Sequence, residues 1–354
     1  MPRTDEVIIR REGRAGRITM NRPQALNALT YAMVGELWKA LTTWKDDPGI
    51  SLVILDGAGE RGLCAGGDIR AMYDSAPRGS DFARRFWADE YRVNALIGRY
   101  PKPYVAFMDG IVMGGGIGLS GHASHRIVTE KSQLAMPETG IGLNPDVGGT
   151  WLLAHAPGET GIYLGLVGER MRGAGTIFAR FADTYVPSAK LPELAAALSQ
   201  VGGGEVDGII QRFAEPPPAS DLASHAGQID RTFGFDSVEA IRAALAAMGG
   251  EWAAKTLAEL DRRSPLALKL TLAAIRKART LPSLEAALNV EYRLVTRLFE
   301  HGEFIEGVRA LIVDKDKSPR WNPPRLEEVT SEMLEAFFAP LPPGQGLGLA
   351  PPPA

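Results

Sequence analysis

Two glycine-rich segments of the sequence could place backbone N–H groups around a reacting carbonyl oxygen. Residues 64–69 read Cys-Ala-Gly-Gly-Asp-Ile, and residues 113–118 read Met-Gly-Gly-Gly-Ile-Gly; both follow a predicted strand and lead into a predicted helix. Glycine allows close backbone approach, and the first N–H groups of a helix lack partners within it. Acyl transfer from a thioester places negative charge on the carbonyl oxygen, which two convergent N–H groups stabilise. The two turns therefore predict an oxyanion site.

Two carboxylates, Glu138 and Asp146, follow these turns on a loop that contains proline and glycine. A carboxylate beside a thioester carbonyl can attack it or activate a water molecule. Taken singly, Glu138 is better explained as a surface or helix-capping carboxylate, and Asp146 as a cap of the next helix. A single glycine-rich turn is likewise more often a turn without a ligand. Only the combination of turns and carboxylates favours catalysis.

The remaining nucleophilic and metal-ligating residue types predict no site. Cys64 is the only cysteine, so no disulfide can form within the chain, and its small apolar neighbours favour a buried residue over a catalytic thiol. The histidines match no metal-binding spacing, and we expect no metal. Those considered are His122, His125 and His155.

Two partial motif matches in one glycine-rich turn are interpreted as coincidences. Residues 116–121 match the dinucleotide pattern G-x-G-x-x-G, whose fingerprint requires an acidic residue at the end of a second strand. Glu138 lies at a suitable distance, but it follows Pro137 and precedes a glycine-rich loop. Residues 118–122 narrowly miss the nucleophile pattern G-x-S-x-G, because His122 replaces the last glycine and Ser120 would fall inside a helix. An NAD oxidoreductase stays open as an alternative on the first match.

The composition is that of an ordinary globular protein. The chain has 354 residues, of which 45% are hydrophobic and 23% charged, and the formal net charge is -3. This balance gives no electrostatic argument for a nucleic-acid partner. No apolar run approaches the ~20 residues needed to cross a bilayer, and no signal segment fits residues 1–6. We expect a soluble, cytoplasmic protein with no membrane partner.

Strand and helix patterns alternate in the first half of the chain, which predicts a largely parallel sheet with helical cover. Thr30 can cap a helix that runs to about residue 45, and an amphipathic helix between residues 81 and 99 carries Glu90. After about residue 158 nearly every segment reads as helix, including one that Pro265 opens and one that starts at residues 283–285. The predicted strands are residues 6–11, 14–20, 51–55, 102–108 and 126–129.

Together these segments resemble the enoyl-CoA hydratase/isomerase, or crotonase, superfamily. Residues 21–29, Asn-Arg-Pro-Gln-Ala-Leu-Asn-Ala-Leu, are similar to its N-terminal signature, and residues 65–68 and 114–116 to its two oxyanion turns. By this resemblance, Gly67 and Gly115 donate the two N–H groups. Three further residues would line the path of coenzyme A: Ala65, Asp68 and Ile69.

The superfamily resemblance implies an α/β fold, a ClpP/crotonase-like spiral of ββα repeats with a C-terminal helical region. We accordingly expect a spiral core domain over residues 1–200, a helical region over residues 201–339 and a disordered Pro- and Gly-rich tail over residues 340–354. Crotonase relatives form trimers or dimers of trimers, so a homo-oligomer, trimer or hexamer, is expected.

The chain looks more specifically like the 3-hydroxyisobutyryl-CoA hydrolases. Residues 137–149 are close to the central motif of that subfamily, although Asn144 replaces an aromatic residue. Residues 90–106 and 302–321 are similar to its preceding segment and to its C-terminal extension. The resemblance implies hydrolysis of a short 3-hydroxyacyl-CoA, foremost 3-hydroxyisobutyryl-CoA to 3-hydroxyisobutyrate and CoA in valine catabolism. Coenzyme A is then part of the substrate, and no separate cofactor is expected.

One position distinguishes hydrolysis from hydration. Hydration of an enoyl thioester needs two acid/base groups, and in the hydratases one of these glutamates comes from the helix after the second glycine turn. The corresponding position here looks like Gly118, which has no side chain. Glu138 remains as nucleophile or general base, and the sequence leaves both open. By hypothesis, Asp146 and Glu90 bind the substrate 3-hydroxyl and orient Glu138.

Two alternatives of other kinds stay open. One is a hydratase, isomerase or racemase on the same scaffold. The other is a catalytically silent protein of this fold that serves in an assembly. The presence of three carboxylates argues against the silent protein, because it has no need of them: Glu90, Glu138 and Asp146.

Overall fold

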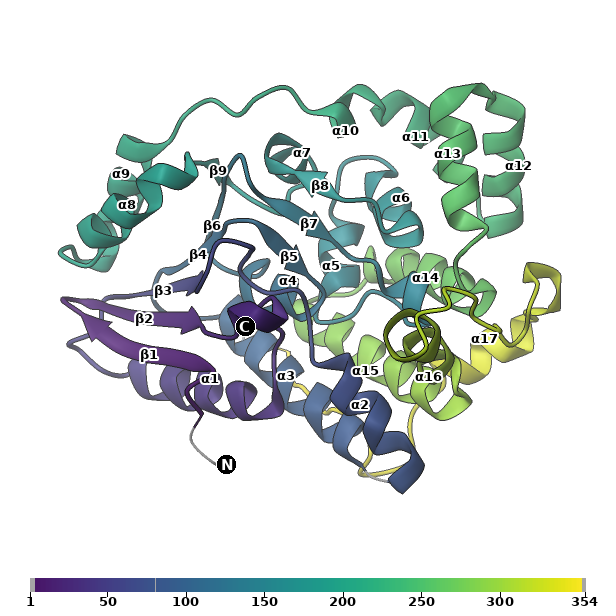
Figure 1. Cartoon of the computed structure of the whole chain (residues 1–354), viewed down its shortest axis with the longest axis horizontal. Helices are drawn as coiled ribbons and strands as arrows, with labels where there is room; N and C mark the ends of the chain where they lie inside the picture. The colour runs from purple at the N-terminus through teal and green to yellow at the C-terminus, as the bar shows by residue number, and fades with distance from the viewer. Residues whose placement is uncertain (1–3, 80, 352–354) are drawn as a thin grey trace. The chain divides into compact units, whose positions relative to one another are not determined.

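The computed structural model (Figure 1) describes residues 4–79 and 81–351. The chain divides into two compact units. The sheet unit comprises Met1–Asp68, Asp89–Ala135 and Met171–Leu222. The helical unit comprises Ile69–Ala88, Met136–Arg170 and Ala223–Ala354. This division differs from the expected boundary at residue 200, because the chain enters the helical unit twice before residue 171. The sequence pattern could not show this division, because each of the two early segments of the helical unit is short.

The sheet unit contains two sheets. The larger has the strand order β1-β2-β3-β4-β6-β9, in which only β1 and β2 pair antiparallel; the smaller has the order β5-β7-β8. The largely parallel sheet predicted from the sequence is therefore confirmed. The strands are β1 (Val7–Glu12), β2 (Ala15–Met20), β3 (Leu52–Gly57), β4 (Tyr104–Met108), β5 (Ile111–Met113), β6 (His125–Val128), β7 (Gln133–Ala135), β8 (Met171–Arg172) and β9 (Thr184–Tyr185).

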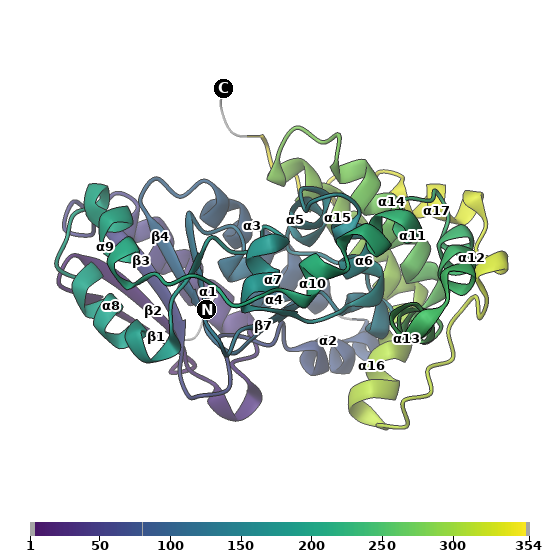
Figure 2. The ribbon, with the colours of Figure 1, turned by 90° about the horizontal axis from the view of Figure 1, so that it is seen from above.

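Different helices cover the two faces of the larger sheet (Figures 1 and 2). On one face, Ala15, Ile54 and Phe107 pack in one buried cluster with apolar side chains of α8 and α9. On the other face, Gly16 lies against the ring of Trp44 in α1, where a Cβ would overlap that ring. Successive strand residues thus point to opposite faces, as the pleat requires. The helices of the sheet unit are α1 (Tyr31–Trp44), α4 (Gly115–Ser120), α7 (Gly173–Phe178), α8 (Leu191–Leu198) and α9 (Val206–Phe213).

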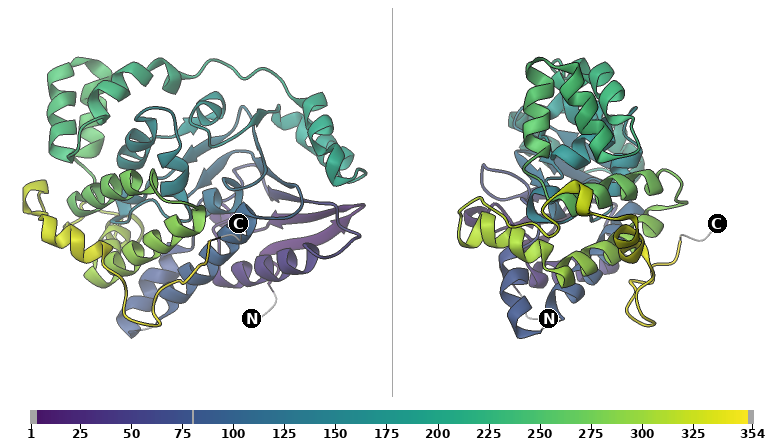
Figure 3. Two further views of the ribbon diagram at one scale, coloured as in Figure 1. Left: turned by 180° about the vertical axis from the view of Figure 1, so that it is seen from behind. Right: turned by 90° about the vertical axis from the view of Figure 1, so that its right-hand side faces the viewer.

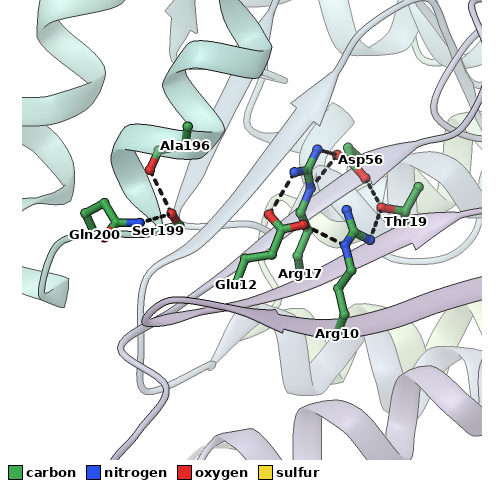
Figure 4. A network of polar contacts seen from close by, with 8 residues as sticks. All are labelled: Arg10, Glu12, Arg17, Thr19, Asp56, Ala196, Ser199 and Gln200. Atoms are coloured by element: carbon green, nitrogen blue, oxygen red, sulfur yellow. Dashed lines mark hydrogen bonds and ion pairs between the residues drawn. The ribbon is translucent and has the colours of Figure 1, made fainter.

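Charged side chains tie the first three strands together across the sheet (Figure 4). Arg17 of β2 donates to Asp56 of β3 (2.5 and 2.9 Å) and to Glu12 of β1 (2.9 Å). Arg10 of β1 donates to Glu12 (2.6 Å) and to Thr19 of β2 (2.9 Å). Each carboxylate here serves more than one donor, so the network fixes the register of β1, β2 and β3.

The helical unit is built around α14, which packs against both α5 and α6 (Figure 2). Ser264 and Ser283 cap α14 and α15, and Thr30 caps α1, so the predicted helix starts are confirmed. Helices α12 and α13 lie side by side (Figure 3). The helices are α2 (Ile69–Ser75), α5 (Gly149–Ala154), α6 (Thr160–Val167), α11 (Ala226–Phe233), α12 (Val238–Met248), α13 (Gly250–Leu260), α14 (Pro265–Ala278), α15 (Leu284–His301), α16 (Glu303–Val308) and α17 (Ser331–Phe338).

Two helices belong to both units, because a unit boundary falls within each of them. These are α3 (Phe82–Gly98) and α10 (Asp221–Ser224). The amphipathic helix predicted between residues 81 and 99 is therefore confirmed as α3. Its C-terminal part, which carries Glu90, lies in the sheet unit.

Residues 340–351 differ from the expected disordered tail. The Asn289 side chain of α15 donates to the Leu349 carbonyl (2.8 Å) and accepts from the Leu349 N–H (3.1 Å). Leu347 is buried, and Arg297 donates to the Pro340 carbonyl (3.1 Å). Composition does not reveal such docking, because the segment binds through its backbone without regular structure. Residues 352–354 lie outside the described residues.

Within the part of the chain that the structure describes, no helix is long and apolar enough to span a bilayer. The same residues contain no cluster of three or more His, Cys, Asp or Glu side chains that could hold a metal ion.

Candidate active site

The first glycine turn is held between two neighbouring segments of the sheet unit. On one side, the Leu29 N–H donates to the Gly66 carbonyl (2.8 Å). On the other, the Met113 N–H donates to the Cys64 carbonyl (3.0 Å). These short parallel pairings place the first turn beside the strand that leads into the second, β5. Residues that are distant in sequence therefore meet at the two glycine turns.

The two expected N–H donors lie next to each other, with Glu90 beside them. A Cβ placed on Gly115 would lie 3.2 Å from the Gly67 nitrogen and 2.6 Å from Glu90 Oε1. Gly115 is the first residue of α4, so its N–H has no acceptor within that helix. The Glu90 side chain, 2% exposed, reaches this point from α3. The structure thus brings together Gly67, Gly115 and Glu90 in the sheet unit.

The three residues expected along a coenzyme A path are all half-buried. The Ala65 N–H donates to the Leu26 carbonyl (3.0 Å), and the Asp68 carboxylate accepts from Arg22 (3.3 Å). Ile69 is the first residue of α2, at the start of the helical unit.

Cys64 is confirmed as a small buried residue. Its side chain is inaccessible to solvent, and burial raises the pKa of the thiol to about 12. Only the thiolate is a nucleophile, and little thiolate forms near neutral pH at such a pKa. Cys64 therefore serves packing between the two glycine turns.

Glu138 opens a short 3-10 helix, Glu138–Ile141, that the helical unit holds from several sides. The Leu143 N–H donates to the Glu138 carbonyl (3.0 Å). The Thr139 hydroxyl donates to the Leu166 carbonyl (3.0 Å), and the Thr139 carbonyl accepts from the Ser264 N–H (3.2 Å). The backbone that carries Glu138 is thereby anchored to α6 and to the start of α14.

The Glu138 side chain is buried, with an exposed fraction of 5%. Its Oε2 atom has no hydrogen-bond partner among residues 4–79 and 81–351. Burial raises the pKa of this carboxyl well above its ordinary value of 4.5, and the nearby carboxylates of Asp146 and Glu291 raise it further. A carboxyl of this kind binds a proton readily and is a stronger base than a solvated glutamate once ionised.

Asp146 lies at the start of a strained loop. Its side chain is 7% exposed, and its carbonyl accepts from the Gly149 N–H (2.6 Å). Val147 and Gly148 both have left-handed backbone angles, with φ of 53° and 81°. A β-branched residue rarely adopts this conformation, so contacts around the loop must enforce it. Asn144, at the position where an aromatic residue was expected, is fully buried.

Glu291 of α15 was not identified from the sequence. It is completely buried and accepts hydrogen bonds from the Gly148 N–H (2.7 Å), the Thr150 N–H (2.9 Å) and the Thr150 hydroxyl. A signal was present, because Glu291 occupies an apolar position of its helix, three residues after Leu288 and three before Leu294. A carboxylate at such a position needs buried donors.

The predicted site residues thus form two groups. Gly67, Gly115 and Glu90 converge in the sheet unit, and Glu138 and Asp146 influence each other in the helical unit, together with Glu291. The first group can donate N–H groups to an oxyanion. The second provides a buried carboxyl with a raised pKa, which suits proton transfer or nucleophilic attack.

Curated relatives match nearly the whole chain. The 3-hydroxyisobutyryl-CoA hydrolase, mitochondrial, of Gallus gallus is 40% identical over 344 residues, which cover 95% of this chain and 89% of the relative. The Homo sapiens protein of the same name is 38% identical over 345 residues, with the same coverage of each chain. An identity of this size over this length shows common family membership.

Solved structures show the same fold at similar identity. A structure titled as a carnitinyl-CoA dehydratase from Mycobacterium thermoresistibile has a TM-score of 0.92 and 46% identity, and covers 96% of this chain and 98% of its own. One titled as an enoyl-CoA hydratase from Rhodobacter sphaeroides has a TM-score of 0.92 and 45% identity, with 98% and 100% covered. A family model described as enoyl-CoA hydratase/isomerase matches residues 15–338. The chain therefore belongs to the enoyl-CoA hydratase/isomerase family, and within it to the branch of its 3-hydroxyisobutyryl-CoA hydrolase relatives.

Proposed function

We propose that this chain hydrolyses a short 3-hydroxyacyl-CoA thioester, 3-hydroxyisobutyryl-CoA foremost, to the free hydroxy acid and coenzyme A. The names of the curated relatives support this reaction. The observation that carries the proposal is Glu138, a buried carboxyl with a raised pKa beside a second carboxylate. Coenzyme A is part of this substrate, and the reaction as proposed needs no separate cofactor.

In the proposed reaction, the thioester carbonyl oxygen accepts hydrogen bonds from the N–H groups of Gly67 and Gly115. Glu138 either attacks the carbonyl carbon to form a mixed anhydride or removes a proton from an attacking water molecule. In the first route the C–S bond breaks as the anhydride forms, and water then cleaves the anhydride to give the free acid and the Glu138 carboxylate. In the second route the water oxygen bonds to the acyl carbon and the C–S bond breaks. In both routes the sulfur leaves with a proton. A glutamate with a raised pKa suits the water route in particular, because it can take the proton from water and return it to the sulfur.

Hydration of an enoyl thioester is the second candidate, because two solved structures of 45–46% identity carry dehydratase and hydratase titles. The helix after the second glycine turn argues against it. This helix, α4, reads Gly-Gly-Ile-Gly-Leu-Ser and contains no acid/base side chain of the kind that hydration needs. The reaction therefore has to be measured.

A panel of acyl-CoA substrates tests the proposal directly. With 3-hydroxyisobutyryl-CoA we expect release of free CoA, measured with a thiol reagent, at a higher rate than with isobutyryl-CoA. Crotonyl-CoA is expected to keep its enoyl absorbance. Loss of that absorbance without thiol release would identify a hydratase and reject the hydrolase.

Replacing Asp146 by alanine should impair hydroxylated substrates most. We propose that Asp146, with Glu90, binds the substrate 3-hydroxyl, and a hydrogen bond to a charged group contributes about 1.5–3 kcal/mol. The kcat/KM for 3-hydroxyisobutyryl-CoA is therefore expected to fall roughly tenfold or more relative to that for isobutyryl-CoA. The matched substrate lacks only the hydroxyl and serves as the control. Equal losses for both substrates would contradict the hydroxyl-binding role.

Location and oligomeric state complete the proposal. We keep the cytoplasmic location expected from the sequence, although the curated relatives carry "mitochondrial" in their names. Cell fractionation of the native host distinguishes the two compartments. We also keep the homo-oligomer, a trimer or hexamer, which light scattering on the purified protein measures.

A further inference from the structure

The segment of residues 146–150, which ends in the first two residues of α5, holds a conformation that its own sequence does not favour. Val147 has a φ of 53°, and a β-branched residue adopts this left-handed backbone conformation only at a cost in free energy. Gly148 follows with a φ of 81°. Such a strained backbone conformation is kept only where contacts with surrounding residues enforce it. The contacts that hold this segment in place must therefore come from residues outside it.

Glu291 of α15 makes such contacts. Its Oε2 accepts from the Gly148 N–H at 2.7 Å, and its Oε1 accepts from the Thr150 N–H at 2.9 Å and from the Thr150 hydroxyl. Both carboxylate oxygens are therefore used, and the loop is held on the far side of the strained residue from Asp146. The Gly149 N–H, between the two anchored N–H groups, donates to the Asp146 carbonyl at 2.6 Å. Position 146 is thus tied to the same short stretch of backbone.

A carboxylate at position 291 is electrostatically unfavourable if its only role is to hold the backbone of residues 148–150. Asp146 and Glu138 are buried nearby, and like charges in a buried site oppose one another. Burial raises the pKa of Glu291 to about 7, and the Asp146 carboxylate contributes to the rise. A neutral side chain would avoid this repulsion. A carboxylate, however, can accept from two backbone N–H groups at once, which a single amide oxygen does less well.

We propose that Glu291 is a positioning residue of the reaction, which holds residues 146–150 so that the Asp146 carboxylate is aimed at the 3-hydroxyl of the substrate. The inference rests on the proposed function and deepens it. It assigns the preference for hydroxylated substrates to a pair of carboxylates in the helical unit, Asp146 in the loop before α5 and Glu291 in α15. Asp146 binds the hydroxyl, and Glu291 holds the segment that carries Asp146.

The test is Glu291→Gln, assayed with 3-hydroxyisobutyryl-CoA and isobutyryl-CoA. Glutamine keeps one acceptor oxygen, but its amide NH2 would face one of the N–H donors of the loop. We expect the ratio of the two kcat/KM values to fall roughly tenfold or more, because misplacement of a binding group costs rate steeply. A residue that only stabilises the fold would leave this ratio unchanged.

Two further variants keep the test decisive. Glu285→Gln changes another buried glutamate in the first turn of α15, and it should leave the ratio at the wild-type value. Thr150→Val removes only the hydroxyl donor to Glu291 and should lower the ratio in the same direction by a smaller factor. This variant decides the question if Glu291→Gln does not fold.

The outcomes separate the inference from the proposed function. If the wild type releases no thiol from 3-hydroxyisobutyryl-CoA, the proposed function is rejected. If the wild type is active and prefers the hydroxylated substrate, but folded Glu291→Gln and Thr150→Val keep that preference, the positioning role is rejected.

Discussion

Replacing Glu138 by glutamine is expected to lower the rate of CoA release from 3-hydroxyisobutyryl-CoA by roughly 100- to 10,000-fold, the usual contribution of a positioned acid/base group. The side chain keeps its shape, but it can neither take a proton from water nor attack the thioester. The fold should survive, because the buried carboxyl already binds a proton readily and an uncharged amide is tolerated in its place. Thiol release gives the rate, and thermal unfolding confirms the folded state.

The pH dependence of wild-type kcat/KM tests the role of Glu138 in a second way. In the proposed reaction Glu138 reacts in its ionised form, so wild-type kcat/KM should rise with pH through its raised pKa and then level off. The midpoint should lie above the 4.5 of an ordinary glutamate. The same shift affects stability: the folded state binds the proton more tightly than the unfolded chain, so this group's contribution declines as pH rises from 4.5 through the folded pKa. Wild-type turnover by Glu138→Gln would reject its catalytic role.

Replacing Gly115 by alanine is expected to reduce turnover roughly 100- to 1,000-fold, the effect of losing one oxyanion donor. The added Cβ would lie 2.6 Å from Glu90 Oε1 and 3.2 Å from the Gly67 nitrogen, so in the proposed reaction it would compete with the carbonyl oxygen for this space. Because the substrate can still bind through coenzyme A, kcat should fall more than KM rises.

Gly208→Ala is the matched control for this variant. Gly208 lies in α9 of the same unit, and a Cβ there meets no atom within 4 Å. Alanine in a helix is favourable relative to glycine by roughly 0.5–1 kcal/mol, so full activity and slightly higher stability are expected. Activity of Gly115→Ala within a factor of a few of wild type would show that the reacting carbonyl does not use the space beside the Gly67 and Gly115 N–H groups.

Local sequence patterns predicted the elements well where the physical signal is local. Thr30 and Ser264 begin their helices because their hydroxyl groups accept the N–H three residues on, and both types of cap can be read from the sequence. The apolar runs of β3 and β4 were predictable for the same reason. The division into units was not, because it depends on which distant segments pack together.

The candidate site shows the same difference between features set by local sequence and features set by the packing of distant segments. The glycine turns and Glu138 were predictable from residue types and from resemblance to a family. The contact between Gly115 and Glu90 was not, because it depends on the angle at which α3 passes the second turn. Glu291 was missed because a glutamate within a long amphipathic helix usually faces solvent. Its apolar neighbours along the helix face indicated otherwise.

The pairing of Glu291 with Gly148 also sets an order of events during synthesis on the ribosome. The two residues are 143 positions apart, and the chain grows at about 5–20 residues per second. The nascent loop around Asp146 must therefore wait on the order of ten seconds or more before its anchor is even made. Until then the strained segment around Val147 lacks the hydrogen bonds that Gly148 and Thr150 donate to Glu291, so this segment reaches its final conformation late. A message cut short before codon 291 would yield a product that lacks this anchor however well its sheet had formed.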